Sequence, residues 1–278
     1  MNKKDMRISE KQRNFYNNEY RKLSKRFQGF ENWRIGYIKR LFADLAVSPL
    51  DTLLDVGVGG TGFTVIAASS AGSYAVGTDI SEVACATARD YATQCRMQSR
   101  AHFVTCSATH LPFRTDTFSK VISNAVLEHI EDDGAALDEL GRVCSDSGRI
   151  SVCVPNSYMF MAWPLAVLNL VNDRRVGHLR HYSSTDLATR GAKRGLRVID
   201  VTFHAHVIKI LQTVLAMAIP AVRNPTSRVW WFLERKDLGA KGDPSGMNVT
   251  VTFEKMATVP TVGAGTNPAT TPTRDTNR

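Results

Sequence analysis

The sequence predicts an α/β fold with a mostly parallel sheet that is covered by helices on both faces. Short apolar segments alternate with segments of helical periodicity, a glycine-rich turn follows the first apolar segment, and an acidic residue ends the second. Apolar strands that alternate with helices are typical of a sheet buried on both faces. Of the 278 residues, 43% are hydrophobic and 22% are charged, which is the composition of a globular protein with a buried core.

The region before the first strand is expected to be helical. Between residues 8 and 47, aromatic and aliphatic side chains recur at spacings of three and four residues, as in Phe15, Tyr16 and Tyr20. This spacing places them on one face of a helix. We therefore expect residues 1–47 to form an N-terminal helical lid segment.

The strand and helix signals then alternate along the chain. Residues 53–56 form a short apolar strand, and the helix after the glycine turn is expected to end near Gly72. Residues 74–79 form a second strand, and Ser81 is placed to cap the next helix. Further strands are expected at residues 102–106, 120–124, 149–154, 196–203 and 249–253, with helices at 134–143 and 185–194.

The remaining segments predict how the chain is divided. We expect one domain over residues 48–256, with apolar and basic cap insertions at 158–182 and 205–235. Residues 257–278 are rich in Thr, Pro, Gly and Asn and are expected to be a disordered tail. The longest apolar stretch, 207–222, contains Lys209 and Gln212 and falls short of the ~20 residues that cross a bilayer, so no spanning helix is expected.

Charge and cysteine content narrow the class of protein further. The net charge of +9 suits a nucleic acid, an anionic membrane surface or an acidic small substrate, and does not choose among them. The five cysteines are odd in number and have no CxxC spacing, so neither a disulfide framework nor a zinc site is indicated. Reduced thiols fit a cytoplasmic protein, and the basic charge allows a peripheral position at a membrane.

A nucleoside-binding site is predicted where the first two strands end. Residues 57–62 match the GxGxxG pattern, in which glycines allow a tight turn and close backbone approach to a ligand at a helix N-terminus. Asp79 ends the next strand, where its carboxylate can accept hydrogen bonds from both ribose hydroxyls of an adenosine.

Asp55 helps to decide which nucleoside cofactor is bound. It lies two residues before Gly57, where a carboxylate would repel the pyrophosphate of NAD. S-adenosylmethionine carries a sulfonium and an ammonium group and no phosphate. The sequence therefore favours S-adenosylmethionine over NAD.

Two segments support this choice by resemblance. Leu111-Pro112-Phe113 and residues 118–130 resemble the middle of the class I S-adenosylmethionine-dependent methyltransferases, of the type 11-like group, and the resemblance covers about residues 50–155. It implies a Rossmann-like, seven-stranded sheet with an antiparallel last strand and a helical cap. The cofactor-binding residues that it implies, with the glycine turn, are Asp55, Gly57, Gly59, Gly62, Asp79, Ile80, Ser107, Ala108 and Asn124.

The resemblance also assigns parts of the cofactor to these residues. Asp55, Gly57 and Gly59 would line the methionine part, Asp79 and Ile80 the ribose and adenine, and Asn124 the entrance to the methyl group. One position departs from the family pattern. Ser107 stands where the family usually has an Asp that receives the adenine amino group, and a neutral hydroxyl is a weaker acceptor, so affinity should be reduced.

The binding site for the methyl acceptor is predicted to include residues 177–183. This segment resembles a Gly-His loop of methyltransferases that act on quinone and lipid-linked substrates, and it supplies three candidate catalytic residues, His178, His181 and Tyr182. A base is needed only if the acceptor loses a proton, and imidazole titrates near neutral pH. Glu128 and His129 resemble a Leu-Glu-His motif of the same group, but two adjacent residues do not make a metal site, and none is predicted.

The apolar segments favour a small or lipid-linked acceptor, with methyl transfer to oxygen. These segments form either a structural cap or a hydrophobic channel for the acceptor. The basic rim of such a channel would be made by Arg174, Arg175, Arg180, Arg223 and Arg228. Nucleic acid is not the expected acceptor, because no Asn/Asp-Pro-Pro-Tyr/Phe motif follows the fourth strand. Two other functions stay open at this stage: a non-catalytic nucleoside-binding protein of the same fold, and an NAD-dependent oxidoreductase.

Overall fold

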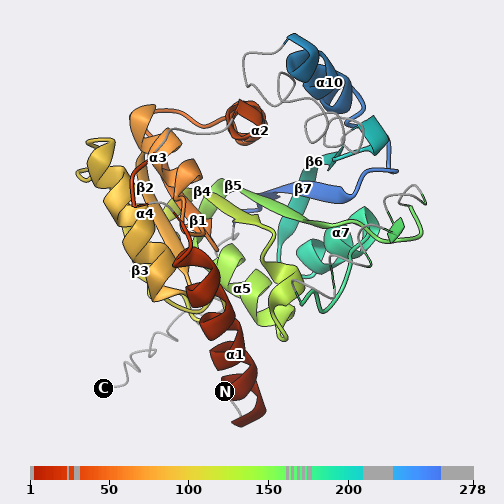
Figure 1. Cartoon of the computed structure of the whole chain (residues 1–278). Helices are drawn as coiled ribbons and strands as arrows, with labels where there is room; N and C mark the ends of the chain where they lie inside the picture. The colour runs from red at the N-terminus through yellow and green to blue at the C-terminus, as the bar shows by residue number, and fades with distance from the viewer. Residues whose placement is uncertain are drawn as a thin grey trace, which may run out of the picture.

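The computed structural model describes residues 3–23, 25–27, 32–160, 177–208 and 228–257, with residues 163, 166, 167, 170 and 173. Within these residues the strands form one seven-stranded sheet in the order β3-β2-β1-β4-β5-β7-β6 (Figure 1). Strand β7 runs antiparallel to both β5 and β6, and the other pairs are parallel. The predicted Rossmann-like fold is confirmed.

The elements follow the predicted alternation closely. The strands are β1 (Thr52–Val56), β2 (Tyr74–Asp79), β3 (Ala101–Thr105), β4 (Phe118–Asn124), β5 (Cys144–Pro155), β6 (Leu196–His204) and β7 (Asn248–Lys255). The helices are α1 (Lys3–Tyr20), α2 (Asn32–Leu45), α3 (Phe63–Ser70), α4 (Glu82–Gln94), η1 (Leu127–His129), α5 (Asp133–Val143), α7 (Ser184–Ala192) and α10 (Arg228–Gly239). Strand β5 begins before the predicted residue 149, and the β4–β5 register shifts between Phe118 and Lys120.

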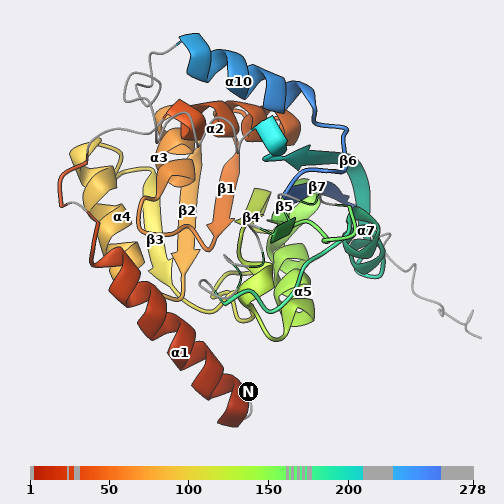
Figure 2. The same ribbon diagram turned by 45° about the vertical axis from the view of Figure 1, so that its right-hand side comes forward.

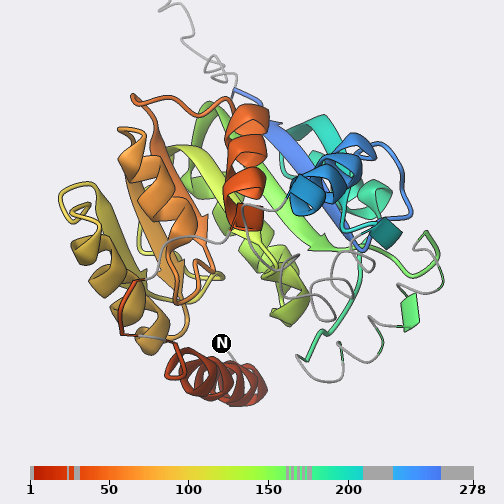
Figure 3. The same cartoon turned by 45° about the horizontal axis from the view of Figure 1, so that its top comes forward.

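The hydrophobic core lies on both faces of the sheet because successive strand residues point to opposite sides. Leu53 packs in the cluster under α2, α3 and α4, whereas Leu54 packs in the cluster with α5 and α7. Both leucines are fully buried. Figures 2 and 3 show α3 and α4 on one face of the sheet and α5 on the other.

The parallel register brings three strand ends to one edge of the sheet. Strand β1 lies between β2 and β4, with Val56 opposite Thr78 on one side and Ser123 on the other. The carboxyl ends of these strands therefore lie side by side, and the loops that follow them share one surface.

The described part of the N-terminal region forms two helices, α1 and α2. Helix α1 lies beside the carboxyl ends of β2 and β3 and contacts α4 (Figure 2). The Ser81 hydroxyl donates to Asn17 Oδ1 at 2.6 Å, and both residues are buried. After α1 the Phe27 backbone N–H donates to the Gln94 side chain at 2.9 Å, and the Phe27 ring packs on Tyr91. The two helices agree with the prediction of a largely helical region over residues 8–47.

Some predicted segments fall outside the described residues. The tail from residue 258 onward and residues 209–227 of the second cap insertion are among them. In the first insertion, Trp163, Ala166, Val167 and Leu170 are helical. In the part of the chain that the structure describes, no helix is both long enough and apolar enough to cross a membrane.

Candidate cofactor and acceptor site

The glycine turn is fixed by hydrogen bonds to the neighbouring strand. The backbone N–H groups of Gly57 and Val58 both donate to the Thr78 carbonyl, at 2.7 and 2.8 Å. Gly57, Gly59 and Gly62 have φ values of +77°, +65° and +56°, in the left-handed region that favours glycine. A Cβ at Gly57 would lie 2.2 Å from Val126 Cγ2, so the turn passes directly under the loop after β4.

Asp79 is oriented by the backbone around it. Its carboxylate accepts hydrogen bonds from the N–H of Gly59 at 3.0 Å and of Ser81 at 2.9 Å. Burial raises the pKa of Asp79, and the backbone donors at Ser81, Gly59 and Ile80 oppose that rise. The carboxylate is therefore held in one position at the end of β2, where two adjacent ribose hydroxyls can donate to it.

A cavity of about 770 Å³ opens at these strand ends. Such a volume is typical of small-molecule and cofactor sites. Five of the predicted cofactor residues line it, namely Gly57, Asp79, Ile80, Ser107 and Ala108. The loop after β4 adds Ala125 and Val126 to the wall, and Ala125 has a φ of +57° that is unusual for a residue with a side chain.

Helix α1 supplies a wall that sequence reasoning did not assign to the site. Gln12, Tyr16 and Tyr20 line the cavity, and the Tyr16 ring meets the His129 ring edge-on with centroids 5.7 Å apart. The Gln12 side-chain amide donates to the His129 carbonyl. The spacing of Tyr16 and Tyr20 by four residues was visible in the sequence, but it also fits a helix that faces a core.

The other predicted cofactor residues do not line the cavity. Asp55 is buried, and burial raises its pKa to about 7 against the opposing effect of the Thr64 hydroxyl. Gly59 faces Tyr20, since a Cβ there would lie 3.1 Å from the Tyr20 hydroxyl. Gly62 packs against Ala88. Asn124, half-buried at the end of β4, precedes the two wall residues of that loop.

Ser107 is on the wall and already has a local partner. Its hydroxyl lies 2.9 Å from the Thr109 hydroxyl, and it accepts the Thr109 backbone N–H at 3.3 Å. His110 Nδ1 lies 2.9 Å from the Thr109 hydroxyl. The departure from the family pattern thus replaces a carboxylate by the hydroxyl groups of Ser107 and Thr109.

The two predicted catalytic histidines meet at one carboxylate, Asp173. His178 Nδ1 lies 2.6 Å from Asp173 Oδ1, and His181 Nε2 lies 2.8 Å from Asp173 Oδ2. The Tyr158 hydroxyl also donates to Asp173, and His181 Nδ1 lies 2.7 Å from the Asn156 carbonyl. Although burial raises the pKa of Asp173, the hydrogen bonds from Tyr158, His181 and His178 hold it below its ordinary value.

Tyr182, the third predicted catalytic residue, is part of the core. Its side chain is fully buried, and its hydroxyl donates to Asp133 Oδ2 at 2.7 Å. Arg180 and Arg190 both pair with Asp133. Burial and the Asp133 carboxylate raise the pKa of Tyr182 far above its ordinary value, so the phenol stays protonated. Tyr182 therefore holds the loop in place and does not reach the cavity.

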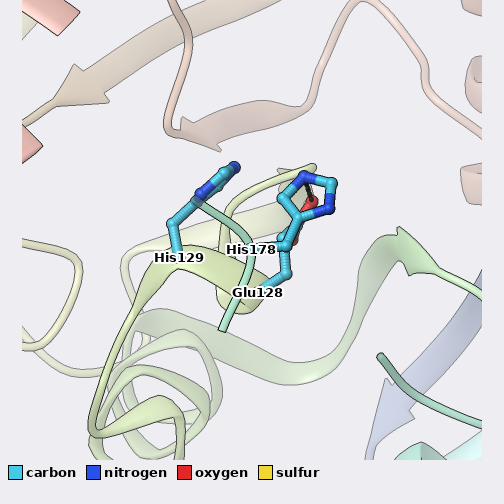
Figure 4. Close-up of side chains that lie close together, drawn as sticks. All are labelled: Glu128, His129 and His178. Carbon is cyan, nitrogen blue, oxygen red and sulfur yellow. Dashed lines mark ion pairs between the residues drawn. The ribbon is translucent and has the colours of Figure 1, made fainter. Parts of the chain in front are cut away.

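Glu128 and His129 lie beside His178 (Figure 4). His129 lines the cavity, and its ring centroid is 4.8 Å from that of His178. Glu128 is fully buried, and burial raises its pKa to about 8. Burial and the neighbouring His178 lower the pKa of His129 to about 4. The Leu179 backbone N–H donates to the Glu128 carbonyl at 2.8 Å and so joins the two loops.

Comparison with known proteins identifies the domain that carries this site. Residues 54–152 match the family model described as a methyltransferase domain. The chain is 32% identical over 123 residues to a demethylmenaquinone methyltransferase of Clavibacter sepedonicus, over 44% of this chain and 46% of that protein. It is 28% identical over 152 residues to the ubiquinone/menaquinone biosynthesis C-methyltransferase UbiE of Agrobacterium fabrum, over 51% and 58%. The chain thus spans about half the length of these relatives.

Solved structures share the fold over a longer part of the chain. The geranyl diphosphate C-methyltransferase of Streptomyces coelicolor A3(2) aligns with a TM-score of 0.64 at 15% identity, over 90% of this chain and 98% of that one. The site also fits the cofactor of this family, S-adenosylmethionine. Gly57 lets the backbone form the floor of the cavity, and Asp79 presents a buried carboxylate on its wall. The prediction of a class I S-adenosylmethionine-dependent methyltransferase domain is confirmed for residues 54–152, which match the family model.

Proposed function

We propose that this protein transfers the methyl group of S-adenosylmethionine to a lipid-linked, quinone-like acceptor. The cavity at the ends of β1, β2 and β4 supports this proposal, because one wall carries Asp79 for the ribose and another carries His129 next to His178. Methyl transfer is an in-line displacement, so holding both reactants in one cavity can supply about 7 to 11 kcal/mol of the barrier.

The acceptor class rests on two observations. The relatives from Clavibacter and Agrobacterium are named for menaquinone or ubiquinone synthesis. In addition, large apolar side chains near the His178 loop are exposed, namely Met159 (82%), Trp163 (77%), Val167 (51%), Leu170 (50%) and Leu179 (49%). An apolar patch of this kind fits a lipid tail or a membrane surface.

The proposed acceptor atom is a ring carbon. Sequence reasoning alone favoured oxygen, but the Agrobacterium relative is named as a C-methyltransferase. Methylation of a ring carbon releases a proton, which gives a base a role near the methyl group. Mass spectrometry and NMR of the product distinguish the carbon product from the oxygen product.

His178→Ala is expected to slow methyl transfer about 100-fold while S-adenosylhomocysteine affinity changes less than about twofold, because a positioned base contributes at least that factor. His178 Nδ1 lies 2.6 Å from Asp173 Oδ1, and neither His178 nor Asp173 lines the cofactor cavity. The measurement is transfer of labelled methyl into the organic phase of a cell lipid extract, with affinity from calorimetry.

His102→Ala is the matched control, since His102 lies on β3 and packs against Tyr74, with the ring centroids 4.9 Å apart. If the His178→Ala protein loses cofactor binding, His178 contributes to the cofactor site and not to the acceptor site. If the wild-type protein binds S-adenosylhomocysteine but labels neither lipid-phase nor water-soluble acceptors, the chain is a nucleoside-binding protein of the same fold.

We also propose that the exposed apolar residues and basic charge bring the protein to a membrane surface. The wild-type protein is expected to sediment with anionic liposomes at low salt and to dissociate as salt rises, since exposed charges are screened over about 8 Å at physiological ionic strength. Of the arginines predicted to form a basic rim, Arg180 pairs with Asp133, and Arg174, Arg175 and Arg223 lie outside the described residues.

The variant that tests this is Trp163→Ser with Met159→Ser, which is expected to reduce binding at least fivefold because two exposed apolar side chains no longer enter the bilayer surface. Leu50→Ser is the control, because Leu50 is 96% exposed in the turn before β1. Equal losses of liposome binding in the double variant and in Leu50→Ser would show that the apolar segment is a structural cap. The same conclusion would follow if the wild-type protein did not sediment with liposomes at low salt.

A further inference from the structure

Three polar side chains in the loop after β3 form a hydrogen-bonded chain on the wall of the cavity. The Ser107 hydroxyl lies 2.9 Å from the Thr109 hydroxyl, which in turn lies 2.9 Å from His110 Nδ1. All three residues line the cavity, and His110 is exposed to solvent. The chain therefore connects a hydroxyl group of the cofactor cavity with an imidazole that can exchange protons with water.

This chain begins next to the residue that is placed to bind the ribose. Strands β2 and β3 are parallel with Asp79 opposite Thr105, and the Cys106 backbone N–H donates to the Asp79 carbonyl at 3.0 Å. Ser107 follows directly in the sequence and lines the same cavity. A nucleoside whose ribose hydroxyls donate to Asp79 can thus extend its base toward the loop after β3, where Ser107 supplies a hydroxyl group.

The Ser107 hydroxyl has room for at most one further donor. A hydroxyl group carries one hydrogen and two acceptor lone pairs. The Thr109 backbone N–H donates to Ser107 Oγ at 3.3 Å and so occupies one lone pair. The second lone pair is free when Ser107 donates its hydrogen to the Thr109 hydroxyl, and it is filled when the Thr109 hydroxyl donates to Ser107. The direction of this hydrogen bond decides whether Ser107 can accept from an amino group of the ligand.

His110 controls that direction. A neutral imidazole has one ring nitrogen that accepts a hydrogen bond, whereas a protonated imidazole donates from both nitrogens. When His110 Nδ1 accepts from the Thr109 hydroxyl, the oxygen of that hydroxyl can accept from Ser107. When His110 is protonated, Nδ1 donates to Thr109, and the Thr109 hydrogen turns toward Ser107. Protonation of His110 therefore reverses both hydrogen bonds of the chain.

We propose that His110 is a positioning residue for the cofactor, which lets Ser107 select the 6-amino group of adenine only while His110 is neutral. In that state the adenine amino group donates to Ser107, Ser107 donates to Thr109, and Thr109 donates to His110. In the protonated state both lone pairs of Ser107 are filled by Thr109, and its own hydrogen faces an amino group that cannot accept it. The proposal concerns the cofactor alone and does not depend on which acceptor is methylated.

The ionisable groups around His110 come from α5, from the loop before α5 and from the end of β3. They are Glu139 with its partner Arg142, Glu131, Asp132 and Cys106. Hydrogen bonding from Arg142 lowers the pKa of Glu139, and burial raises the pKa of the Cys106 thiol to about 11. Neither group therefore changes charge between about pH 5.5 and pH 8, the range in which imidazole titrates.

The test compares S-adenosylhomocysteine with its analogue that carries purine in place of adenine and so lacks only the 6-amino group. Calorimetry without acceptor gives the ratio of the two dissociation constants. Burial raises the pKa of Asp55 to about 7 and of Glu128 to about 8, so both groups titrate in the same range, but they affect both ligands alike and cancel in the ratio. We expect the analogue to bind about fivefold more weakly at about pH 8, and as tightly as S-adenosylhomocysteine or more tightly at about pH 5.5.

Variants of the chain identify which residue titrates. His110→Ala and Thr109→Val should each give a ratio that does not change with pH, because a proton can no longer reverse the hydrogen bonds. Ser107→Asp should raise the ratio at both pH values, since a carboxylate only accepts and forms a stronger, charge-assisted hydrogen bond. His102→Ala is the control and should keep the pH dependence of the wild type, because His102 lies on β3 and is not among the residues that line the cavity.

Thermal melting at both pH values checks that each variant is folded. Two results would overturn the proposal: a wild-type ratio that is the same at both pH values, or a pH-dependent ratio that persists in His110→Ala. A ratio near one at both values would also show that Ser107 does not contact the amino group. If the folded wild-type protein bound neither ligand, the assignment of the cofactor would fail together with this proposal.

Discussion

Asp79→Ala is expected to weaken S-adenosylhomocysteine binding at least 100-fold. The carboxylate lies on the cavity wall at the end of β2, and it is held there by the backbone N–H groups of Gly59 and Ser81. Two ribose hydroxyls that donate to it form charge-assisted hydrogen bonds worth about 1.5 to 3 kcal/mol each. Losing about 3 kcal/mol corresponds to roughly 100-fold in affinity. Isothermal titration calorimetry measures the change directly.

Asp79 also stabilises the glycine turn, so a second variant separates binding from folding. Asp79→Asn keeps the size of the side chain and one acceptor oxygen, and we expect its affinity to lie between those of the wild type and Asp79→Ala. Asp138→Asn is the control, because Asp138 is 62% exposed on α5 and pairs with Arg194. An Asp79→Ala protein that melts normally and binds S-adenosylhomocysteine as tightly as the wild type would contradict the proposal that Asp79 binds the ribose hydroxyls.

Gly57→Ala is expected to lower both stability and cofactor affinity. A residue with a side chain at a φ of +77° costs about 1 to 2 kcal/mol. The added Cβ would also lie 2.2 Å from Val126 Cγ2, and overpacking of this kind costs about 1 to 3 kcal/mol. We therefore expect a loss of about 2 to 5 kcal/mol in the free energy of unfolding, and at least 100-fold weaker S-adenosylhomocysteine binding because Val126 must move into the cavity.

The double variant Gly57→Ala/Val126→Ala separates the two causes. Shortening Val126 removes the steric overlap but leaves the strained φ, so part of the lost stability should return and the rest should not. Gly141→Ala is the matched control, since a Cβ there would first meet Leu196 at 3.9 Å and alanine favours a helix. Chemical denaturation and calorimetry measure both quantities. Wild-type stability and affinity in the Gly57→Ala protein would contradict this account of the turn.

The alternating strands and helices were predictable because they depend on near neighbours in the sequence. Leu53 and Leu54 indicated a strand buried on both faces, and Ser81 indicated a helix start. The structure bears out both, since Leu53 and Leu54 pack in different core clusters and the Ser81 hydroxyl accepts the Ala84 N–H. The position of Asp79 at the end of β2 was also predictable, because the end of a strand is set by the same local pattern of residues.

The acceptor side could not be predicted in the same way. From the sequence, His178, His181 and Tyr182 were candidates within one loop. In the structure Tyr182 points into the core toward Asp133, whereas both histidines face Asp173. Which side chain of an irregular loop faces a cavity depends on what packs against that loop, and no periodicity in the sequence reports this.

The sequence by itself determined the sheet, the glycine turn and the acidic residue that follows it, because strand periodicity, turn chemistry and helix capping act over a few residues. The tertiary structure alone decided that α1 covers the cavity with Tyr16 and Tyr20, and that His178 lies beside Glu128 and His129. These contacts join segments far apart in the chain. Their geometry is set by how the helices and loops pack around the sheet, which the local pattern of residues does not encode.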